Sequence, residues 1–296
     1  MRIAILFSGQ GGQQPEHLER LKAEADPELA AALALAVPEL WQGGGAALSC
    51  NRLAQPLIFG YQMMLWRQLQ IPKPICVAGY SLGEMTACCV AGAFPAKAGV
   101  ALCAERARLM DAAFPEPAGL LAIIGLNRGQ VEEVAHRHGL HLSIVNGQNH
   151  MVLGGSKAAL AEAEVSALAL GATRTVVLAV STPSHTPLLA EAGAGFRQIL
   201  ANQNLGGRLA FPVLSAVDGR AAYTPSAALA ALSRQIDTTL DWAACLENLL
   251  EMQPDRVLEI GPGNALARML EERAPGLPVR ATGDFRSVEG IHNWLT

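Results

Sequence analysis

The sequence predicts an α/β protein, with a parallel sheet flanked by helices and a smaller ferredoxin-like unit inserted in the middle of the chain. Two observations predict this fold class. In the outer parts of the chain, short continuous apolar runs, typical of strands buried on both faces, alternate with longer segments of helical period. In the middle, this alternation changes to strand, helix, two strands, helix and strand, which is the order of a ferredoxin-like domain.

The outer segments supply the parallel sheet. Its strands are expected at 2–9, 75–80, 211–217 and 256–261. Helices are expected at 15–35, 53–70, 82–93, 97–113, 186–203 and 241–252, with a last long helix after the turn "EIGPGNAL". Strands that alternate with helices along the chain favour a sheet covered by helices on both faces.

The middle segment begins with the strand "GLLAIIG" (119–125) and the helical "NRGQVEEVAHRHG". The strands "LHLSIVNG" and "HMVLGGS", the helix "KAALAEAEVSALALG" and the strand "TRTVVLAV" follow. The stretches "FPEP" and "STPSHTP" on either side are typical of joints. We therefore expect a ferredoxin-like small domain over 116–181 and a large domain built from 1–115 and 182–296. The cleft between two such domains is a favoured ligand site.

The composition indicates a chain with a large buried core, since 51% of its 296 residues are apolar and 16% are charged. A formal net charge of −4 makes nucleic acid a poor candidate partner. No apolar run reaches the roughly 18 residues of a membrane span. The start, "MRIAILFSGQGG", is too short and too weakly charged for a signal peptide. The six cysteines lack metal-ligand spacing, so we expect a reduced, cytoplasmic protein.

Ser81 is the candidate nucleophile. It is the serine of "GYSLG" (79–83), a G-x-S-x-G motif between an apolar strand and a helical segment, which is the context of a nucleophile elbow. Small flanking residues let neighbouring backbone pass close to such a turn, and the amide of Leu82 then points at a developing oxyanion. The alternative is that Ser81 only caps the helix.

His185 is the histidine best placed to act as a base for Ser81. It lies in "STPSHTP", directly after a strand and at the joint between the expected domains, although loop histidines are often inert surface residues. His136, His138 and His141 suggest a metal cluster instead. The simpler explanation for them is compensation of the helix dipole at a helix end.

Two glycine-rich turns follow expected strands. "FSGQGGQQ" (7–14) lacks the third glycine of a dinucleotide-binding fingerprint, and no G-K-S/T follows, so a phosphate loop is not expected. This turn can instead direct backbone N–H groups into the crevice that holds Ser81. "EIGPGNAL" (259–266) is a second turn of the same kind.

Together these motifs resemble the malonyl-CoA:acyl carrier protein transacylases, and more broadly the acyltransferases of fatty acid and polyketide synthesis. The matching segments are "FSGQGGQ", "GYSLGE", "ERARLM", "MVLGG", "VSTPSHTPLL" and "EIGPGNAL". Their order and spacing agree from residue 2 to about residue 270. The resemblance implies an α/β-hydrolase-like large domain with a ferredoxin-like insertion. It also implies no cofactor and no metal, with malonyl-CoA and an acyl carrier protein as substrate and partner.

The resemblance further implies the roles of individual residues. Ser81 would be acylated, and His185 would be its general base. The backbone carbonyl of Gln235, rather than an acid, would orient the imidazole. Gln10 and Leu82 would supply the two N–H groups of the oxyanion hole.

Four more positions are implied to contact the substrate. Arg106 would grip the free carboxylate of malonyl through a two-pronged contact, although Arg106 and Arg108 look alike in the sequence. Asn146 matches an asparagine on the small-domain side of the cleft. Ser184 stands where malonyl-selective polyketide-synthase members usually have phenylalanine, which leaves selectivity against methylmalonyl open. Tyr80 replaces the histidine that usually precedes the nucleophile.

The remaining differences from the family pattern indicate which branch of the family the chain resembles most. Ser8 replaces a proline, and Gly147 and Gln148 follow Asn146 in place of Ser-Pro. Tyr80 and the altered segment after "GQGGQ" make the chain most similar to the acyltransferase (epsilon) subunit of malonate decarboxylase. That subunit primes a dedicated carrier protein, so other malonate decarboxylase subunits are possible partners. The alternative is a malonyl transacylase of fatty acid or polyketide biosynthesis.

Two other classes of function share part of this pattern. A serine esterase or thioesterase would have the same elbow but needs an acid between Ser81 and His185 in chain order, for which Asp111 and Glu162 are candidates without a motif. A non-catalytic docking subunit would be expected to lack Ser81, His185 or Arg106, and all three are present. We therefore expect ping-pong acyl transfer.

Overall fold

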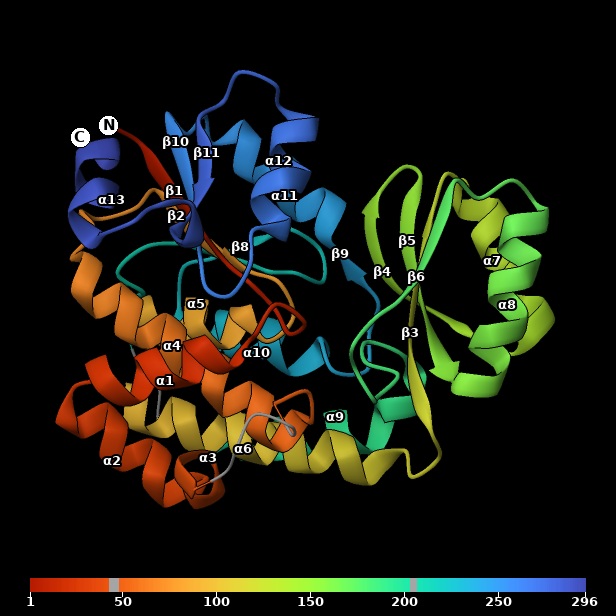
Figure 1. Cartoon of the computed structure of the whole chain (residues 1–296), viewed down its shortest axis with the longest axis horizontal. Coiled ribbons are helices and arrows are strands. Elements are labelled where there is room, and N and C mark those ends of the chain that lie inside the picture. The colour runs from red at the N-terminus through yellow and green to blue at the C-terminus, as the bar shows by residue number, and fades with distance from the viewer. Residues whose placement is uncertain (43–47, 203–206) are drawn as a thin grey trace.

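The computed structural model describes residues 1–42, 48–202 and 207–296 and contains two sheets (Figure 1). The first sheet has the strand order β11-β10-β1-β2-β7-β8. Its strands are β1 (Ile3–Phe7), β2 (Cys76–Gly79), β7 (Val213–Leu214), β8 (Ala221–Ala222), β10 (Arg256–Ile260) and β11 (Val279–Ala281). Neighbouring strands are parallel except for the pair β7 and β8, which is antiparallel.

The second sheet has the strand order β6-β3-β5-β4-β9. Its strands are β3 (Ala118–Ile124), β4 (His141–Gly147), β5 (His150–Ser156), β6 (Arg174–Val177) and β9 (Leu240–Asp241). The four strands from the middle of the chain pair antiparallel in the order of a ferredoxin-like unit. The predicted fold class is confirmed.

Strand β9 was not expected in this sheet. It comes from the C-terminal part of the chain and pairs parallel with β4, Ile144 opposite Leu240 and Val145 opposite Asp241. A sheet predicted from residues 116–181 is therefore completed by a segment outside that range. The predicted boundaries between the two domains stay a prediction.

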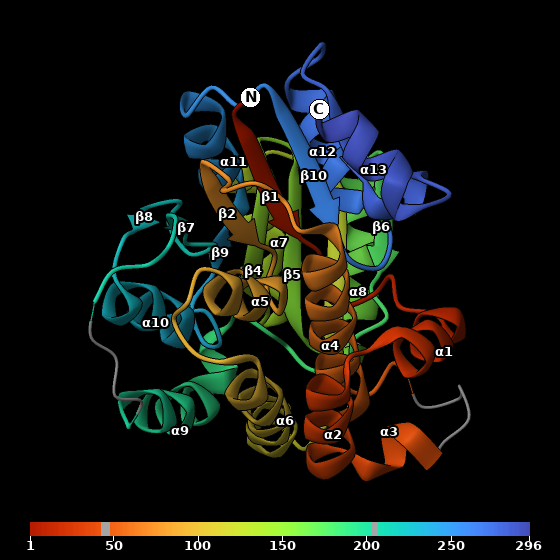
Figure 2. The same ribbon diagram turned by 90° about the vertical axis from the view of Figure 1, so that its left-hand side faces the viewer.

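Helices form layers around the sheets (Figure 2). The helices are α1 (Pro15–Glu24), α2 (Pro27–Ala36), α3 (Pro38–Gln42), α4 (Asn51–Leu69), α5 (Gly83–Val90), α6 (Ala96–Ala113), α7 (Arg128–His138), α8 (Lys157–Ala169), α9 (Ala190–Ala201), α10 (Pro225–Arg234), α11 (Trp242–Glu251), α12 (Ala265–Arg273) and α13 (Val288–Leu295). Single 3-10 turns lie at Pro187–Leu189 and Thr282–Asp284. Within the described residues, no helix has the length and apolar character needed to span a membrane.

The apolar strands are buried on both faces. Ile3, Ile5 and Phe7 of β1 pack into the core formed with α4, α5 and α6, whereas Ala4 and Leu6 pack into the core formed with α11 and α12. The second core also contains residues of β3, β4 and β5, so it joins the two sheets. A third core lies between the other face of the second sheet and helices α7 and α8.

Some expected elements differ in the structure. The helix expected over 15–35 is divided into α1 and α2, because Pro27 has no N–H to continue a helix and Asp26 caps the new one by accepting from the amide of Leu29. The helix expected over 186–203 starts as a 3-10 turn and continues as α9 to Ala201, and residue 203 lies outside the described residues. The strand expected over 211–217 has two residues.

Candidate active site

The carboxyl ends of three neighbouring strands bring three turns together. β10, β1 and β2 are adjacent and parallel, so the turns after Ile260, Phe7 and Gly79 lie at one edge of the sheet. Gln62 of α4 holds two of these turns, since its side-chain N–H donates to the carbonyl oxygens of Ser8 at 2.7 Å and of Ile260 at 3.3 Å. The glycine-rich turns and the G-x-S-x-G motif therefore share one crevice.

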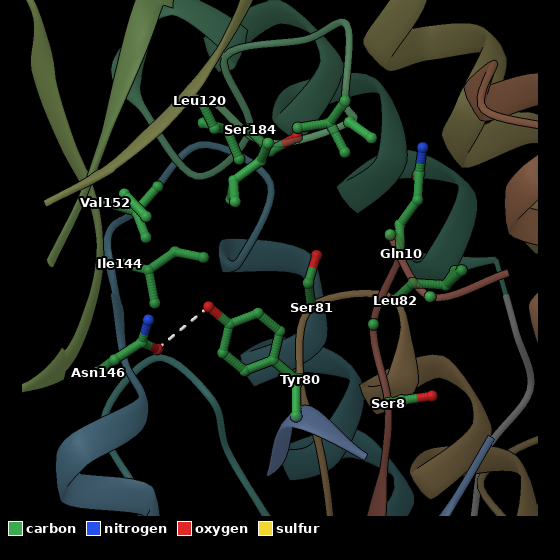
Figure 3. Close-up of a pocket in the computed structure, with 18 of the residues that line it drawn as sticks. Ser8, Gln10, Tyr80, Ser81, Leu82, Leu120, Ile144, Asn146, Val152 and Ser184 are labelled. Carbon is green, nitrogen blue, oxygen red and sulfur yellow. Dashed lines mark hydrogen bonds between the residues drawn. The ribbon is translucent and has the colours of Figure 1, made fainter. Parts of the chain in front are cut away.

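Ser81 lies on a tight turn between β2 and α5. Its backbone φ is 52°, in the left-handed region that most side chains avoid. A Cβ on Gly79 would collide with the backbone of Gly83, and a Cβ on Gly83 would collide with the carbonyl of Phe7. Both glycines are therefore required for the turn that presents the Ser81 side chain to the cavity in Figure 3.

Ser81 and His185 are in hydrogen-bond contact. Ser81 Oγ lies 2.7 Å from His185 Nε2, and His185 is 1% exposed. The other ring nitrogen, Nδ1, donates to the backbone carbonyl of Gln235. Because a carbonyl only accepts, Nδ1 carries the proton and Nε2 is free to accept one from the Ser81 hydroxyl. The backbone N–H of His185 donates to the carbonyl of Ile236 at 2.9 Å, which fixes the main chain of the loop at His185.

Burial is the main cause that lowers the pKa of His185 to about 3; the hydrogen bond to Gln235 opposes this shift, and the nearby Arg106 charge adds to it. At neutral pH the imidazole is therefore the neutral base that acylation of a serine needs. A neutral imidazole with one nitrogen occupied by Gln235 presents a single acceptor to Ser81.

The rate of Ser81 acylation is expected to persist as the pH falls through 6.5, the ordinary pKa of histidine, because a lowered pKa keeps His185 unprotonated there. Stopped-flow measurement of kcat/KM between pH 5 and 8 checks this. Repeating the profile with Glu84→Gln separates His185 from the Glu84 carboxyl, whose pKa burial raises to about 7. A midpoint near 6.5 in both proteins would contradict the prediction.

Arg106 is a buried cation beside this pair. Its side chain is 1% exposed, and it lines the cavity with Ser81 and His185. The guanidinium donates to two neutral amide oxygens, Gln55 Oε1 at 2.9 Å and Gln235 Oε1 at 2.8 Å. Burial lowers its pKa to about 10, so the group stays charged at neutral pH. A charged guanidinium held only by neutral acceptors is suited to bind an anion from the cavity.

Gln10 and Leu82 are the two residues whose backbone amides were predicted to form an oxyanion hole. Gln10 lies in the turn after β1, Leu82 immediately follows Ser81, and both line the cavity (Figure 3). Within the described residues, neither backbone N–H donates a hydrogen bond. The Gln10 side chain donates to the carbonyl of Ser49 at 3.1 Å, which fixes the turn. Free N–H groups beside a nucleophile can stabilise a developing oxyanion.

Tyr80, Asn146 and Ser184 also line the cavity. The Tyr80 hydroxyl donates to Asn146 Oδ1 at 3.1 Å, a contact between the elbow and β4 that is drawn in Figure 3. The Tyr80 ring packs edge-on against Trp242, with ring centroids 5.2 Å apart. The Ser184 hydroxyl lies 3.1 Å from Thr182 Oγ1, and Ser184 is buried.

Eight of the nine site residues predicted from the sequence line a single cavity of about 480 Å³, and Gln235 lies behind His185. One wall of the cavity is the inner face of the second sheet, with paired rows such as Ala122 and Val152. At the end of β3, Ile124 lies opposite His150 of β5 on one side and opposite the exposed Arg174 of β6 on the other. The cavity is thus an apolar slot with polar groups gathered at Ser81.

Comparison with known proteins agrees with this geometry. The profile described as the acyl transferase domain matches residues 23–276. The chain belongs to this family. A malonyl CoA-acyl carrier protein transacylase of Salmonella typhimurium is 30% identical to this acyltransferase, with 96% of each chain covered. One of Mycobacterium bovis is also 30% identical, covering 98% of this chain and 99% of the relative.

Solved structures share the fold of this acyltransferase. A malonyl-transacylase solved in complex with a holo type II PKS acyl-carrier protein has a TM-score of 0.88 and 30% identity, and covers 99% of this chain and 100% of the other. An acyl carrier protein S-malonyltransferase of Vibrio cholerae has a TM-score of 0.86 and 27% identity, and covers 98% and 100%. The recognition of the malonyl-CoA:acyl carrier protein transacylase family from motifs is confirmed, and the chain is an enzyme of this type.

The residues considered for other functions lie apart from Ser81. Asp111 accepts a hydrogen bond from Asn51 at 2.6 Å, and Glu162 is an exposed residue of α8. Neither faces His185 Nδ1, which is occupied by a carbonyl. His138 contacts Ser166 at 2.8 Å. In the described part of the acyltransferase, no group of three or more His, Cys, Asp or Glu side chains could hold a metal ion.

Three buried polar residues of the acyltransferase were missed in the sequence. Gln62 braces the turns, Gln55 accepts from Arg106, and Glu84 accepts from Gln235. The sequence did contain a signal for Glu84, because it is the last residue of the "GYSLGE" segment. The structure adds that its side chain is fully buried. Gln55 and Gln62 lie among the apolar residues of α4, where only the structure shows what they contact.

Proposed function

We propose that this acyltransferase moves a malonyl group from malonyl-CoA to the phosphopantetheine thiol of an acyl carrier protein through an ester on Ser81. The observation that supports this most is the 2.7 Å contact between Ser81 Oγ and His185 Nε2 in a cavity that Arg106 also lines. The names of the full-length relatives support malonyl-CoA as donor and a carrier protein as acceptor. Malonyl transacylases of this family need no cofactor.

The first half of the reaction acylates the enzyme. His185 Nε2 takes the proton of Ser81 as Oγ attacks the thioester carbonyl carbon. The oxyanion that forms lies against the N–H groups of Gln10 and Leu82. When the intermediate collapses, the carbon–sulfur bond breaks and the proton on His185 passes to the departing sulfur of coenzyme A. The malonyl carboxylate pairs with Arg106, which orients the acyl group.

The second half transfers the group to the carrier. The phosphopantetheine thiol enters the same slot and gives its proton to His185. The thiolate attacks the ester carbon, the bond to Oγ breaks, and His185 returns the proton to Ser81. The backbone carbonyl of Gln235 stabilises the imidazolium that exists between these steps. Tyr80, Asn146 and Ser184 shape the walls around the acyl chain and arm.

Acyl-enzyme formation tests the proposal directly. Intact-mass analysis after mixing with malonyl-CoA, methylmalonyl-CoA or acetyl-CoA is expected to show a malonyl adduct, and no adduct from any donor would overturn the proposed function. A methylmalonyl adduct of similar yield would show that the room left by Ser184 admits an α-methyl group.

The proposed acceptor is the carrier protein of malonate decarboxylase, with the other subunits of that enzyme as partners. Tyr80 in place of the usual histidine before the nucleophile supports this branch, and the structure accommodates it, with its hydroxyl bonded to Asn146 and its ring packed on Trp242. The alternative acceptor is the carrier of fatty acid or polyketide synthesis. The relatives named malonyl CoA-acyl carrier protein transacylase and the complex with a type II PKS carrier favour that alternative.

A carrier exchange distinguishes these two acceptors. Malonyl-loaded enzyme is expected to acylate the malonate decarboxylase carrier with a kcat/KM at least about 10-fold above that for a fatty acid carrier, which corresponds to about 1.4 kcal/mol. Transfer is followed by the mass of each carrier, with apo carriers that lack phosphopantetheine as controls. A preference for the fatty acid carrier would assign the enzyme to the alternative.

A further inference from the structure

Glu84 is a buried carboxyl group without a part in the mechanism above. It lies in the first turn of α5, three residues after Ser81, and is 0% exposed. Its Oε2 accepts from Gln235 Nε2 at 2.7 Å and from the backbone N–H of Ala216 at 3.4 Å. Its Oε1 has no hydrogen-bond partner in the described part of the chain. Burying a carboxyl group is unfavourable unless hydrogen bonds or an opposite charge compensate it.

The contacts of Gln235 determine which way its side-chain amide points. Its Nε2 donates to Glu84 Oε2 and, at 3.0 Å, to the carbonyl of Ser81. The carbonyl only accepts, and Glu84 Oε2 accepts both when the carboxyl is ionised and when its proton is on Oε1. Its Oε1 accepts from Arg106 Nη2 at 2.8 Å, and a guanidinium only donates. A flipped amide would place donor against donor at Arg106 and acceptor against acceptor at Glu84.

We propose that Glu84 is a positioning residue that orients Gln235 and, through Gln235, aims the Arg106 guanidinium at the acyl group. This inference rests on the proposed function, in which Arg106 binds the malonyl carboxylate. Gln235 also holds His185 through its backbone carbonyl, so Glu84 reaches both the base and the acyl-selecting cation through a single residue.

Gln235 lies between Glu84 and Arg106, and this arrangement explains how the Arg106 guanidinium stays available to substrate. A carboxylate in direct contact with the guanidinium would form a charge-assisted pair that competes with the malonyl group. Here Gln235 separates the two charges and offers Arg106 only a neutral oxygen. When it is ionised, Glu84 also contributes a nearby negative charge that offsets the buried cation. An incoming carboxylate therefore meets the Arg106 guanidinium as a charged group of fixed orientation, which is bound only to neutral oxygens.

Replacing Glu84 with leucine tests this role. Glu84→Leu removes the acceptor, so Gln235 can turn and Arg106 loses its aim. The kcat/KM for malonyl-CoA is expected to fall about 10- to 100-fold more than that for acetyl-CoA, which has no carboxylate to bind. Glu84→Gln retains an acceptor oxygen for Gln235 and is expected to keep the malonyl-to-acetyl ratio within about 3-fold of the unmodified enzyme.

Glu259 offers a matched control. It is also 0% exposed, accepts from a backbone amide, that of Ala267 at 2.8 Å, and burial raises its pKa to about 7. It lines the same cavity, but it has no hydrogen bond to Gln235, Arg106 or His185 within the described residues. Glu259→Leu is expected to lower the melting temperature without changing the malonyl-to-acetyl ratio, whereas Glu84→Leu changes both.

A double variant keeps the test valid if Glu84→Leu does not fold. In Glu84→Leu with Gln235→Leu both partners of the hydrogen bond become apolar, which is less disruptive than removing one. Its malonyl-to-acetyl ratio should equal that of Gln235→Leu alone. A ratio in the double variant that is lower than in Gln235→Leu alone would overturn the positioning role. An equal loss of kcat/KM for malonyl-CoA and acetyl-CoA in Glu84→Leu would overturn it as well. Absence of malonyl preference in the unmodified enzyme would instead overturn the proposed function.

Discussion

Replacing Ser81 with alanine is expected to abolish the malonyl adduct and to lower the rate of transfer to the carrier by at least about 10⁴-fold, because no other hydroxyl stands opposite His185 Nε2 in the described cavity. Intact-mass analysis after mixing with malonyl-CoA measures the adduct, and the mass of the carrier measures the transfer. The fold should persist, since alanine is smaller than serine and has the same Cβ at the left-handed backbone of residue 81.

Ser226→Ala is the matched control for this change. Ser226 lies at the start of α10, outside the cavity, and its hydroxyl contacts only Thr224 among the described side chains. That variant should form the malonyl adduct at the normal rate. An adduct that survives in Ser81→Ala would place the acyl group on another residue and contradict the ping-pong scheme.

Replacing Arg106 with alanine is expected to shift the acyl preference from malonyl toward acetyl. Loss of a buried charged partner for the malonyl carboxylate costs about 2–4 kcal/mol of transition-state binding, roughly 30- to 1,000-fold in kcat/KM for malonyl-CoA. Acetyl-CoA, which carries no carboxylate, should be affected far less. Steady-state kinetics with the two donors measures the ratio, and a thermal melt checks folding, since Gln55 and Gln235 lose a donor.

The neighbouring Arg108→Ala provides the control. Arg108 lies on the same helix, but it is exposed and pairs with Glu105 in solvent. Its removal should leave both donors unaffected, because exposed pairs contribute little. Survival of the malonyl preference in Arg106→Ala would show that another group selects the carboxylate.

The pair of arginines shows what the sequence can and cannot establish. Strands β1, β2 and β10 were predicted well because each is a continuous apolar run that ends at a glycine-rich turn. Arg106 and Arg108 could not be separated by pattern, since which of them is buried depends on how α6 packs against α4. The resemblance to a family supplied the choice, and the structure supplies its physical basis in the contacts with Gln55 and Gln235.

Elements without an apolar pattern of their own were missed. β8 and β9 have two residues each, too short to show alternation, and they form only because a neighbouring strand offers free backbone groups. Ser81 and His185 are 104 positions apart, so their hydrogen bond follows from the fold as a whole. Glu84 escaped notice for a similar reason, because its partner Gln235 lies 151 positions away.

Strand β9 has a mechanical consequence for the cavity. It begins five residues after Gln235 and is paired with β4, the strand that carries Asn146, which in turn bonds Tyr80 beside the nucleophile. Strand β4 is thus held twice, by backbone pairing with β9 and by the side-chain contact between Asn146 and Tyr80. A shift of β4 away from the elbow would also displace β9 and, five residues before it, the Gln235 carbonyl that accepts from His185. We therefore expect the cleft to keep a nearly constant width, so that a thioester arm enters it without a closing movement of the two sheets.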